Sequence, residues 1–99
     1  MKGATFSEVY DAIYYGADID MQGKTAFYHI SSGRNEQQKH CISVYLYDAH
    51  PDFAPTVYHK IYDAENDDAT VSLERFMQAP IFDGRSLYEA KDDMTVIYL

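Results

Sequence analysis

Histidine and cysteine are the side chains of this chain with the widest chemical repertoire, and it carries four of the first and one of the second. These residues are His29, His40, Cys41, His50 and His59. Imidazole and thiolate suit Zn²⁺, but the spacing matches neither a zinc finger nor a zinc ribbon. Scattered histidines on a sheet are more often hydrogen-bonded groups, so we expect no metal and no cofactor. The alternative is a small-ligand or metal-binding regulatory module that uses His29, Cys41 and His59.

Catalytic pairs are the second kind of candidate. Cys41 with a histidine would give a nucleophile and its base, and His50-Pro51-Asp52 would give a base with an orienting carboxylate. Neither spacing fixes a geometry. The chain has no Gly-rich phosphate loop, no His-Glu-x-x-His and no nucleophile elbow. We expect a protein that is not an enzyme, with a small enzyme as a further alternative.

An acidic stretch invites a test for calcium. Asp63, Glu65, Asp67 and Glu74 have the spacing of the first, third, fifth and twelfth positions of a calcium loop. The sixth position requires glycine for a sharp bend, and here it is Asp68. A solvated acidic turn explains the stretch better than a calcium site does.

Charge limits the partners of the chain. Sixteen acidic and eight basic side chains give a net charge of −8, which repels nucleic-acid phosphates and anionic lipid headgroups. No apolar run approaches the roughly 18 residues of a membrane span, and the lone Cys41 fits a reducing compartment. We expect a cytoplasmic protein with a basic protein partner and no direct contact with nucleic acid or membrane.

Tyrosine is the other unusual feature, with ten residues in 99. Tyrosines on two predicted neighbouring strands would form one aromatic patch, and nearby acids would steer a basic partner toward it. The alternative is a face that a helix covers or that is simply solvated. The predicted anchors are Tyr45, Tyr47, Tyr58 and Tyr62, and the predicted acidic rim is Asp63, Glu65, Asp67 and Asp68.

Periodicity predicts the elements that position these residues. A capping box at Thr5 and Glu8 begins a helix that ends at Gly16, and a β-hairpin with its turn at Gln22-Gly23 follows. The later elements are a polar loop (31–40), a strand (41–47), a Pro-containing loop (48–56), a strand (57–62), an acidic turn (63–68), a helix from Ser72 to Met77 ended by Pro80, a turn at Asp83-Gly84, a helical turn capped by Ser86 and Glu89, and a strand (94–99).

These elements predict a single α+β domain with the order α-β-β-β-β-α-β. The sheet is mainly antiparallel, with four to five strands, an N-terminal helix and one or two short C-terminal helices. If the last strand lies at an edge, it offers free backbone groups for a homodimer or an added strand.

Segments near both ends resemble small single-domain proteins of Gram-positive bacteria and their phages. They are Thr5-Phe6-Ser7-Glu8-Val9-Tyr10, Gln22-Gly23-Lys24 and Ile81-Phe82-Asp83-Gly84-Arg85-Ser86-Leu87. Those proteins are largely uncharacterised, so the resemblance implies an α+β fold and a mobile-element context and transfers no functional residue. The hypothesis is a non-enzymatic acidic protein that binds a basic protein surface, such as the cleft of a nucleic-acid-binding protein that it would inhibit.

Overall fold

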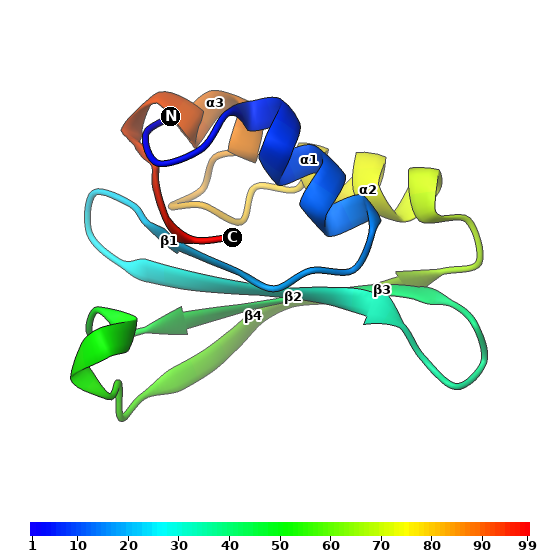
Figure 1. Ribbon diagram of the computed structural model, residues 1–99, viewed down its shortest axis with the longest axis horizontal. Coiled ribbons are helices and arrows are strands. Elements are labelled where there is room, and N and C mark those ends of the chain that lie inside the picture. Colours follow the sequence, from blue (N-terminus) through cyan, green and yellow to red (C-terminus); the bar gives the residue numbers. More distant parts are fainter.

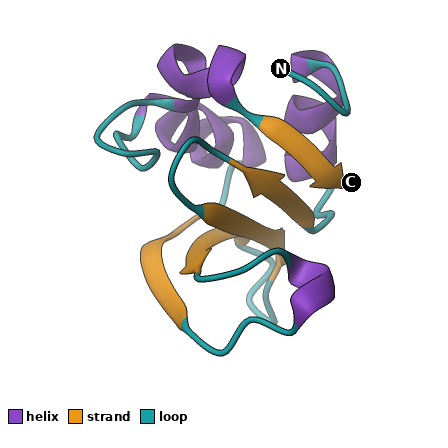
Figure 2. Cartoon of the chain, turned by 90° about the vertical axis from the view of Figure 1, so that its left-hand side faces the viewer, coloured by secondary structure: helices purple, strands orange, loops and turns teal.

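The computed structural model describes residues 1–99 and has two layers, with the α-helices on one side of a five-stranded antiparallel sheet (Figure 1). A short 3-10 helix lies beyond the other side (Figure 2). The sheet order is β4-β3-β2-β1-β5. The helices are α1 (Phe6–Tyr14), α2 (Ala69–Gln78), α3 (Leu87–Ala90), η1 (Pro51–Phe53) and η2 (Lys91–Asp93), and the strands are β1 (Ile19–Gln22), β2 (Phe27–Arg34), β3 (His40–Tyr47), β4 (Tyr58–Asn66) and β5 (Thr95–Tyr98).

This architecture confirms the predicted α+β class and element order. Both predicted capping boxes are present, at Thr5 with Glu8 and at Ser86 with Glu89. Gly16 ends α1 with a φ of +88°, and a Cβ there would lie 3.0 Å from the Gly33 Cα atom. Glycine is therefore required where the chain leaves α1 and passes against β2. None of the helices has the length and apolar character that crossing a membrane requires.

The core lies between the helices and the sheet face beneath them, which we call the covered face. Side chains of β1, β2 and β3 that point to this face pack against α1, α2 and the segment after α2. Phe82 contacts the rings of Tyr28 and Phe76 edge-on, at centroid distances of 5.0 and 6.1 Å. The central residues of the core are Val9, Ile13, Ile19, Met21, Ile30, Ile42, Val44, Leu73, Phe76 and Met77.

The predicted polar loop over 31–40 is wrong at both of its ends, and only residues 35–39 connect the two strands. β2 continues to Arg34, β3 begins at His40, and the two pair from Phe27 opposite Tyr47 to Arg34 opposite His40. Backbone hydrogen bonds pair the two strands at this end of the sheet. Apolar side chains are not needed there, because the side away from the helices faces solvent and can carry small polar residues. The pattern of apolar residues therefore could not indicate that this segment belongs to the strands.

The acidic turn over 63–68 and the start of the second helix also need correction. β4 extends through Asn66, and α2 begins at Ala69 with Asp68 as its N-cap. The Asp68 carboxylate accepts hydrogen bonds from the Thr70 and Val71 backbone N–H groups. Ser72 lies inside α2, where its hydroxyl has a different partner, described below.

Both edge strands contain a register irregularity that reverses one tyrosine. In β4 the shift after Lys60 places Tyr62 opposite Val44, on the covered face. In β5 the shift places Tyr98 opposite Asp20, on the face away from the helices. A bulge adds one residue to one strand, so every side chain beyond it changes face relative to simple alternation.

The last strand lies at an edge, and its outer side is partly paired. The Lys2 backbone donates to Met94 O at 3.1 Å and accepts from the Val96 N–H at 2.7 Å. β4 forms the opposite edge, where its bulge and Lys60 are features that discourage pairing with another strand.

Candidate functional site

The sheet side away from the helices, which we call the open face, carries rings and carboxylates in an ordered arrangement. Cross-strand register groups its side chains into rows, because opposed residues share a face. From one end of the sheet to the other, the rows are Gln22, Phe27, Tyr47 and Tyr58; then Asp20, His29, Tyr45 and Lys60; then Ser31, Ser43 and Asp63; then Gly33, Cys41 and Glu65. The open face is thus aromatic at one end and small, polar and acidic at the other.

The aromatic end forms a continuous run of rings that begins in the loop between β3 and β4. Phe53 contacts His50 at 5.6 Å, His50 contacts Phe27 at 5.9 Å, Phe27 contacts Tyr47 at 6.2 Å, and Tyr47 contacts Tyr58 at 5.4 Å between centroids. Tyr47 lies under its neighbours and is only 4% exposed, whereas Tyr58 is 57% and Phe53 77% exposed. We call Phe53, His50, Phe27, Tyr47 and Tyr58 the ring run.

A carboxylate is fixed at the side of this run. Asp20 Oδ1 accepts the Tyr47 hydroxyl and also lies 2.9 Å from His29 Nδ1. Burial, with the Asp20 carboxylate as the next cause, raises the pKa of Tyr47 far above its usual range. Tyr47 therefore stays protonated and donates to Asp20 at any physiological pH, which orients the carboxylate at the base of the rings.

The loop that carries η1 is tied to the same region. The Tyr98 hydroxyl donates to Asp52 Oδ1, and this bond raises the pKa of the tyrosine. Asp48 accepts from the Thr56 N–H and hydroxyl, which closes the base of the loop and lowers the pKa of Asp48. These contacts hold Asp52 and Phe53 beside the sheet.

A cation from the chain itself lies in the next row. Lys60 Nζ is 5.7 Å from the centroid of the Tyr45 ring and 3.3 Å from Asp63 Oδ2. The Asp63 contact raises the pKa of Lys60, with Tyr45 a smaller cause. The open face thus already holds a positive charge between a ring and a carboxylate.

The structure brings together most of the predicted tyrosine anchors, but not all. Tyr45, Tyr47 and Tyr58 lie on the open face as neighbours. The expectation that Tyr62 shares their patch is wrong, because the β4 bulge turns its ring onto Phe76, at 5.8 Å. Burial there raises the pKa of Tyr62.

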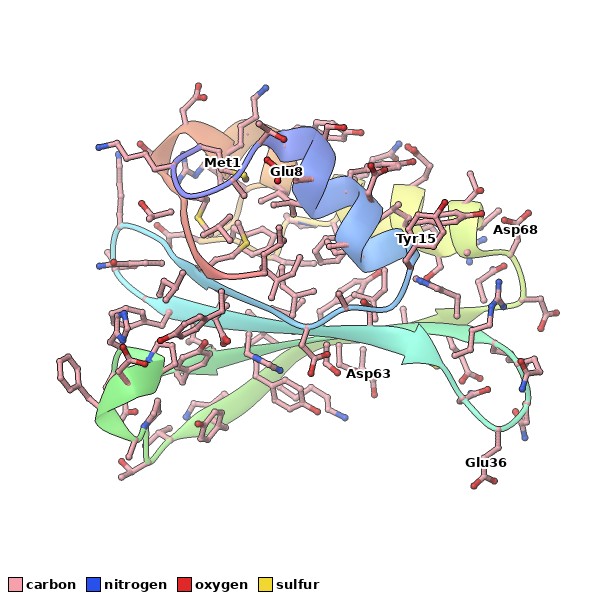
Figure 3. The ribbon with its side chains drawn as sticks, in the orientation of Figure 1. Met1, Glu8, Tyr15, Glu36, Asp63 and Asp68 are labelled. Atoms are coloured by element: carbon pink, nitrogen blue, oxygen red, sulfur yellow. The ribbon has the colours of Figure 1, made fainter.

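The predicted acidic rim divides in the same way. Asp63 and Glu65 lie on the open face, and Asp63 points away from the helices (Figure 3). Asp67 is exposed in the turn after β4, and Asp68 caps α2. The sequence interpretation did not include Asp18, Asp20 or Asp52 in this rim. The pairing of β1 and the fold of the η1 loop place Asp20 and Asp52 beside the rings and Asp18 3.9 Å from His29.

The ligands proposed for a metal-binding module do not meet. His29 lies on the open face, whereas His59 stands opposite Leu46 on the covered side. No group of three or more His, Cys, Asp or Glu side chains is arranged to hold a metal ion. The calcium spacing is broken as well, because Glu74 lies on α2 and accepts from the Tyr10 hydroxyl at 3.0 Å.

The side chains considered for catalysis lie at opposite ends of the open face, with Cys41 at one end and His50, whose Nδ1 is 3.7 Å from Asp52 Oδ2, at the other. Cys41 lines a shallow hollow of about 220 Å³ with Ser31, Gly33 and Ser43. Partial burial, followed by the Glu65 carboxylate, raises the pKa of the Cys41 thiol, so the reactive thiolate is disfavoured. His50 Nδ1 accepts from the Asp52 N–H at 3.1 Å and caps η1.

His40, which was named from the sequence only among the possible zinc ligands, is buried. His40 Nε2 lies 3.0 Å from Ile13 O and its Nδ1 lies 2.8 Å from Ser72 Oγ. Because a carbonyl only accepts, Nε2 donates to Ile13, which in the neutral ring leaves Nδ1 to accept from Ser72. Ser72 is 4% exposed, so this serine and histidine pair joins β3, α1 and α2 inside the molecule.

No protein-family model, curated protein or solved structure matches this chain. The open face remains the part of the surface where exposed rings and carboxylates from several strands converge. Exposed rings also occur on the helix side, as at Tyr15 near the end of α1 (Figure 3), but Tyr14 and Tyr15 contact each other and line a hollow that has Arg34 and no acidic residue in its lining.

Proposed function

We propose that this protein is an acidic interaction module that binds a basic surface of another protein through the open face of its sheet. The observation that carries the proposal is the ring run, which crosses β2, β3 and β4 with no α-helix over it and has the Asp20 carboxylate beside it. A face of this kind combines the large rigid area of aromatic anchors with charges that attract a basic partner.

The acids of the open face lie in two groups, one near β1 and one on β4. Asp20 and Asp52 lie beside the ring run on the β1 side, Asp18 Oδ2 lies 3.9 Å from His29 Nε2, and Asp63 and Glu65 lie toward the far end of β4. Lys60 is the basic residue among the paired positions of this face, and Asp63 already contacts it. The net charge of the face is therefore negative, as is that of the whole chain at −8.

The partner class that best fits this charge is a protein that binds nucleic acid. Its binding cleft is basic, and an acidic aromatic surface would compete there with phosphates and bases. The protein would then inhibit its partner by occupying this cleft, without catalysing a reaction.

Affinity capture with charge-matched variants tests the proposal. The tagged protein is incubated with extract of its native host at low and high salt, and captured proteins are quantified for wild type, for Asp63→Lys with Glu65→Lys, and for Asp11→Lys with Asp92→Lys. Both double variants change the net charge equally, but Asp11 and Asp92 lie outside the sheet. We expect the open-face variant to lose its partner and the control variant to retain it.

The salt dependence separates electrostatic binding of a partner from non-specific adhesion. Binding through rim charges weakens as salt screens them, so a true partner is captured less at high salt. Equal loss of capture in both double variants would mean that total charge, rather than the open face, determines binding. Capture that is unchanged by the open-face substitutions would refute the proposal.

A further inference from the structure

We infer that the open face is selective for arginine, and that it binds the guanidinium groups of an arginine-rich segment by stacking them on exposed rings of the ring run. This inference rests on the proposed function and names the side chain that the face recognises. It is separable from that function, because a basic partner presenting mainly lysine would satisfy the function and not the inference.

The chain's own cation shows how a positive group fits this face. Lys60 Nζ lies over the Tyr45 ring and beside the Asp63 carboxylate, so both groups contact the same positive charge. The ring run has the same two components but no cation of its own, since the other such contact in the molecule joins Lys91 to Phe6. Tyr58 and Phe53 therefore present free ring surface to an incoming cation.

The carboxylates beside the ring run retain acceptor capacity. Asp20 uses Oδ1 for both of its hydrogen bonds, and Asp52 uses Oδ1 for the Tyr98 hydroxyl. The second oxygen of each takes no hydrogen bond from the protein. The Asp52 side chain is 59% exposed, so its free oxygen is accessible to a donor from solvent.

Guanidinium suits this combination better than ammonium does. Its plane stacks on an aromatic ring while its N–H groups reach a carboxylate at the ring's edge, and it gives up its weaker hydration more readily. An ammonium group is a compact, strongly hydrated charge that gains mainly from the carboxylates. Exposed rings with the carboxylates of Asp20 and Asp52 at their side therefore favour arginine over lysine at equal charge.

Fluorescein-labelled hexa-arginine and hexa-lysine peptides test this selectivity. Each is titrated with the full-length protein at moderate salt, and the dissociation constant is measured by fluorescence anisotropy. We expect hexa-arginine to bind at least about threefold more tightly than hexa-lysine. Phe53→Ser and Tyr58→Ser should each weaken hexa-arginine binding by about two- to fivefold and affect hexa-lysine less.

Tyr15→Ser is the matched control, because Tyr15 is 82% exposed on the helix side. It should leave both peptides unaffected, and Asp52→Asn should weaken both. Equal affinity for the two peptides, or equal effects of Tyr15→Ser and Tyr58→Ser, would overturn the inference. If lysine and arginine bind equally while host-partner capture still depends on Asp63 and Glu65, only the selectivity fails and the proposed function stands.

Discussion

The covered and open faces of the sheet are built from the same strands, but different forces maintain them. The covered face is made of aliphatic side chains with Met21, Tyr28 and Tyr62, which pack against α1, α2 and Phe82. The open face is made of rings, serines and carboxylates joined by side-chain hydrogen bonds, such as those from Tyr47 to Asp20 and from Ser43 to Asp63. The covered face supplies stability by burial, which leaves the open face available for binding.

The bulges sharpen this contrast, because each moves a tyrosine from the face that alternation predicts. Tyr62 enters the core and stacks edge-on against Phe76, while Tyr98 leaves the core side and joins Asp52. The same residue type thus contributes packing in one edge strand and a polar contact in the other. Backbone register, rather than residue type, decides which role a tyrosine has.

The largest expected difference between the faces is in stability. Phe76→Ala removes a fully buried ring and should lower the free energy of unfolding by about 3 to 5 kcal/mol. Tyr58→Ala removes an exposed ring and should lower it by less than about 1 kcal/mol. Urea denaturation measures both, and similar losses for the two variants would show that the open face also stabilises the fold.

A second prediction compares the displaced tyrosines. Tyr62→Ala should lower the unfolding free energy by about 2 kcal/mol, because half-buried ring area against the core is lost. Tyr98→Ala should lower it by about 0.5 kcal/mol, since that ring is exposed. The opposite ranking in thermal or urea denaturation would mean that the bulges are placed wrongly.

A third prediction concerns alkaline pH. The raised pKa of Tyr47 means that the folded state keeps a proton that the unfolded chain releases near the ordinary value of 10.0. Its contribution to stability is therefore complete below that pH and is lost as the pH rises above it.

Tyr47→Phe should lower the unfolding free energy at neutral pH by about 1.5 to 3 kcal/mol, the range for a hydrogen bond to a charged group. It should also make the decline in stability above pH 10 shallower, without abolishing it, because burial raises the pKa of Tyr28 and Tyr62 too. Urea titrations between neutral pH and pH 11 give both quantities. An unchanged alkaline slope in the variant would contradict the raised pKa of Tyr47.

The smallest effect is expected from the charges of the open face. Asp63→Asn breaks an exposed ion pair with Lys60 and should change the unfolding free energy by less than about 1 kcal/mol. A double-mutant cycle with Lys60→Met isolates the coupling between the two residues. A coupling well above that limit would mean that the pair stabilises the sheet and is not free to rearrange for a partner.

Local signals in the sequence found the elements whose ends are fixed by short-range hydrogen bonds. Both capping boxes, the stop at Gly16 and the Asp83-Gly84 turn occur where the residue types predict them. Strand ends were less predictable, because Ser31 to Arg34 and Asp63 to Asn66 pair through the backbone although most of their side chains are polar and none is a large apolar one. Asp20 and Asp52 carried no local signal for the candidate site.

The sequence by itself determined the class of fold, the alternation that gives the sheet an apolar side, and the net negative charge of −8. These depend on residue types and on spacings of a few residues, which a linear chain displays directly. The tertiary structure decided which tyrosines lie on which face, which carboxylates stand beside the rings, and that His40 is buried against Ser72 and Ile13. Register shifts and contacts between distant strands fix those features, and a single inserted residue in a strand is enough to reverse them.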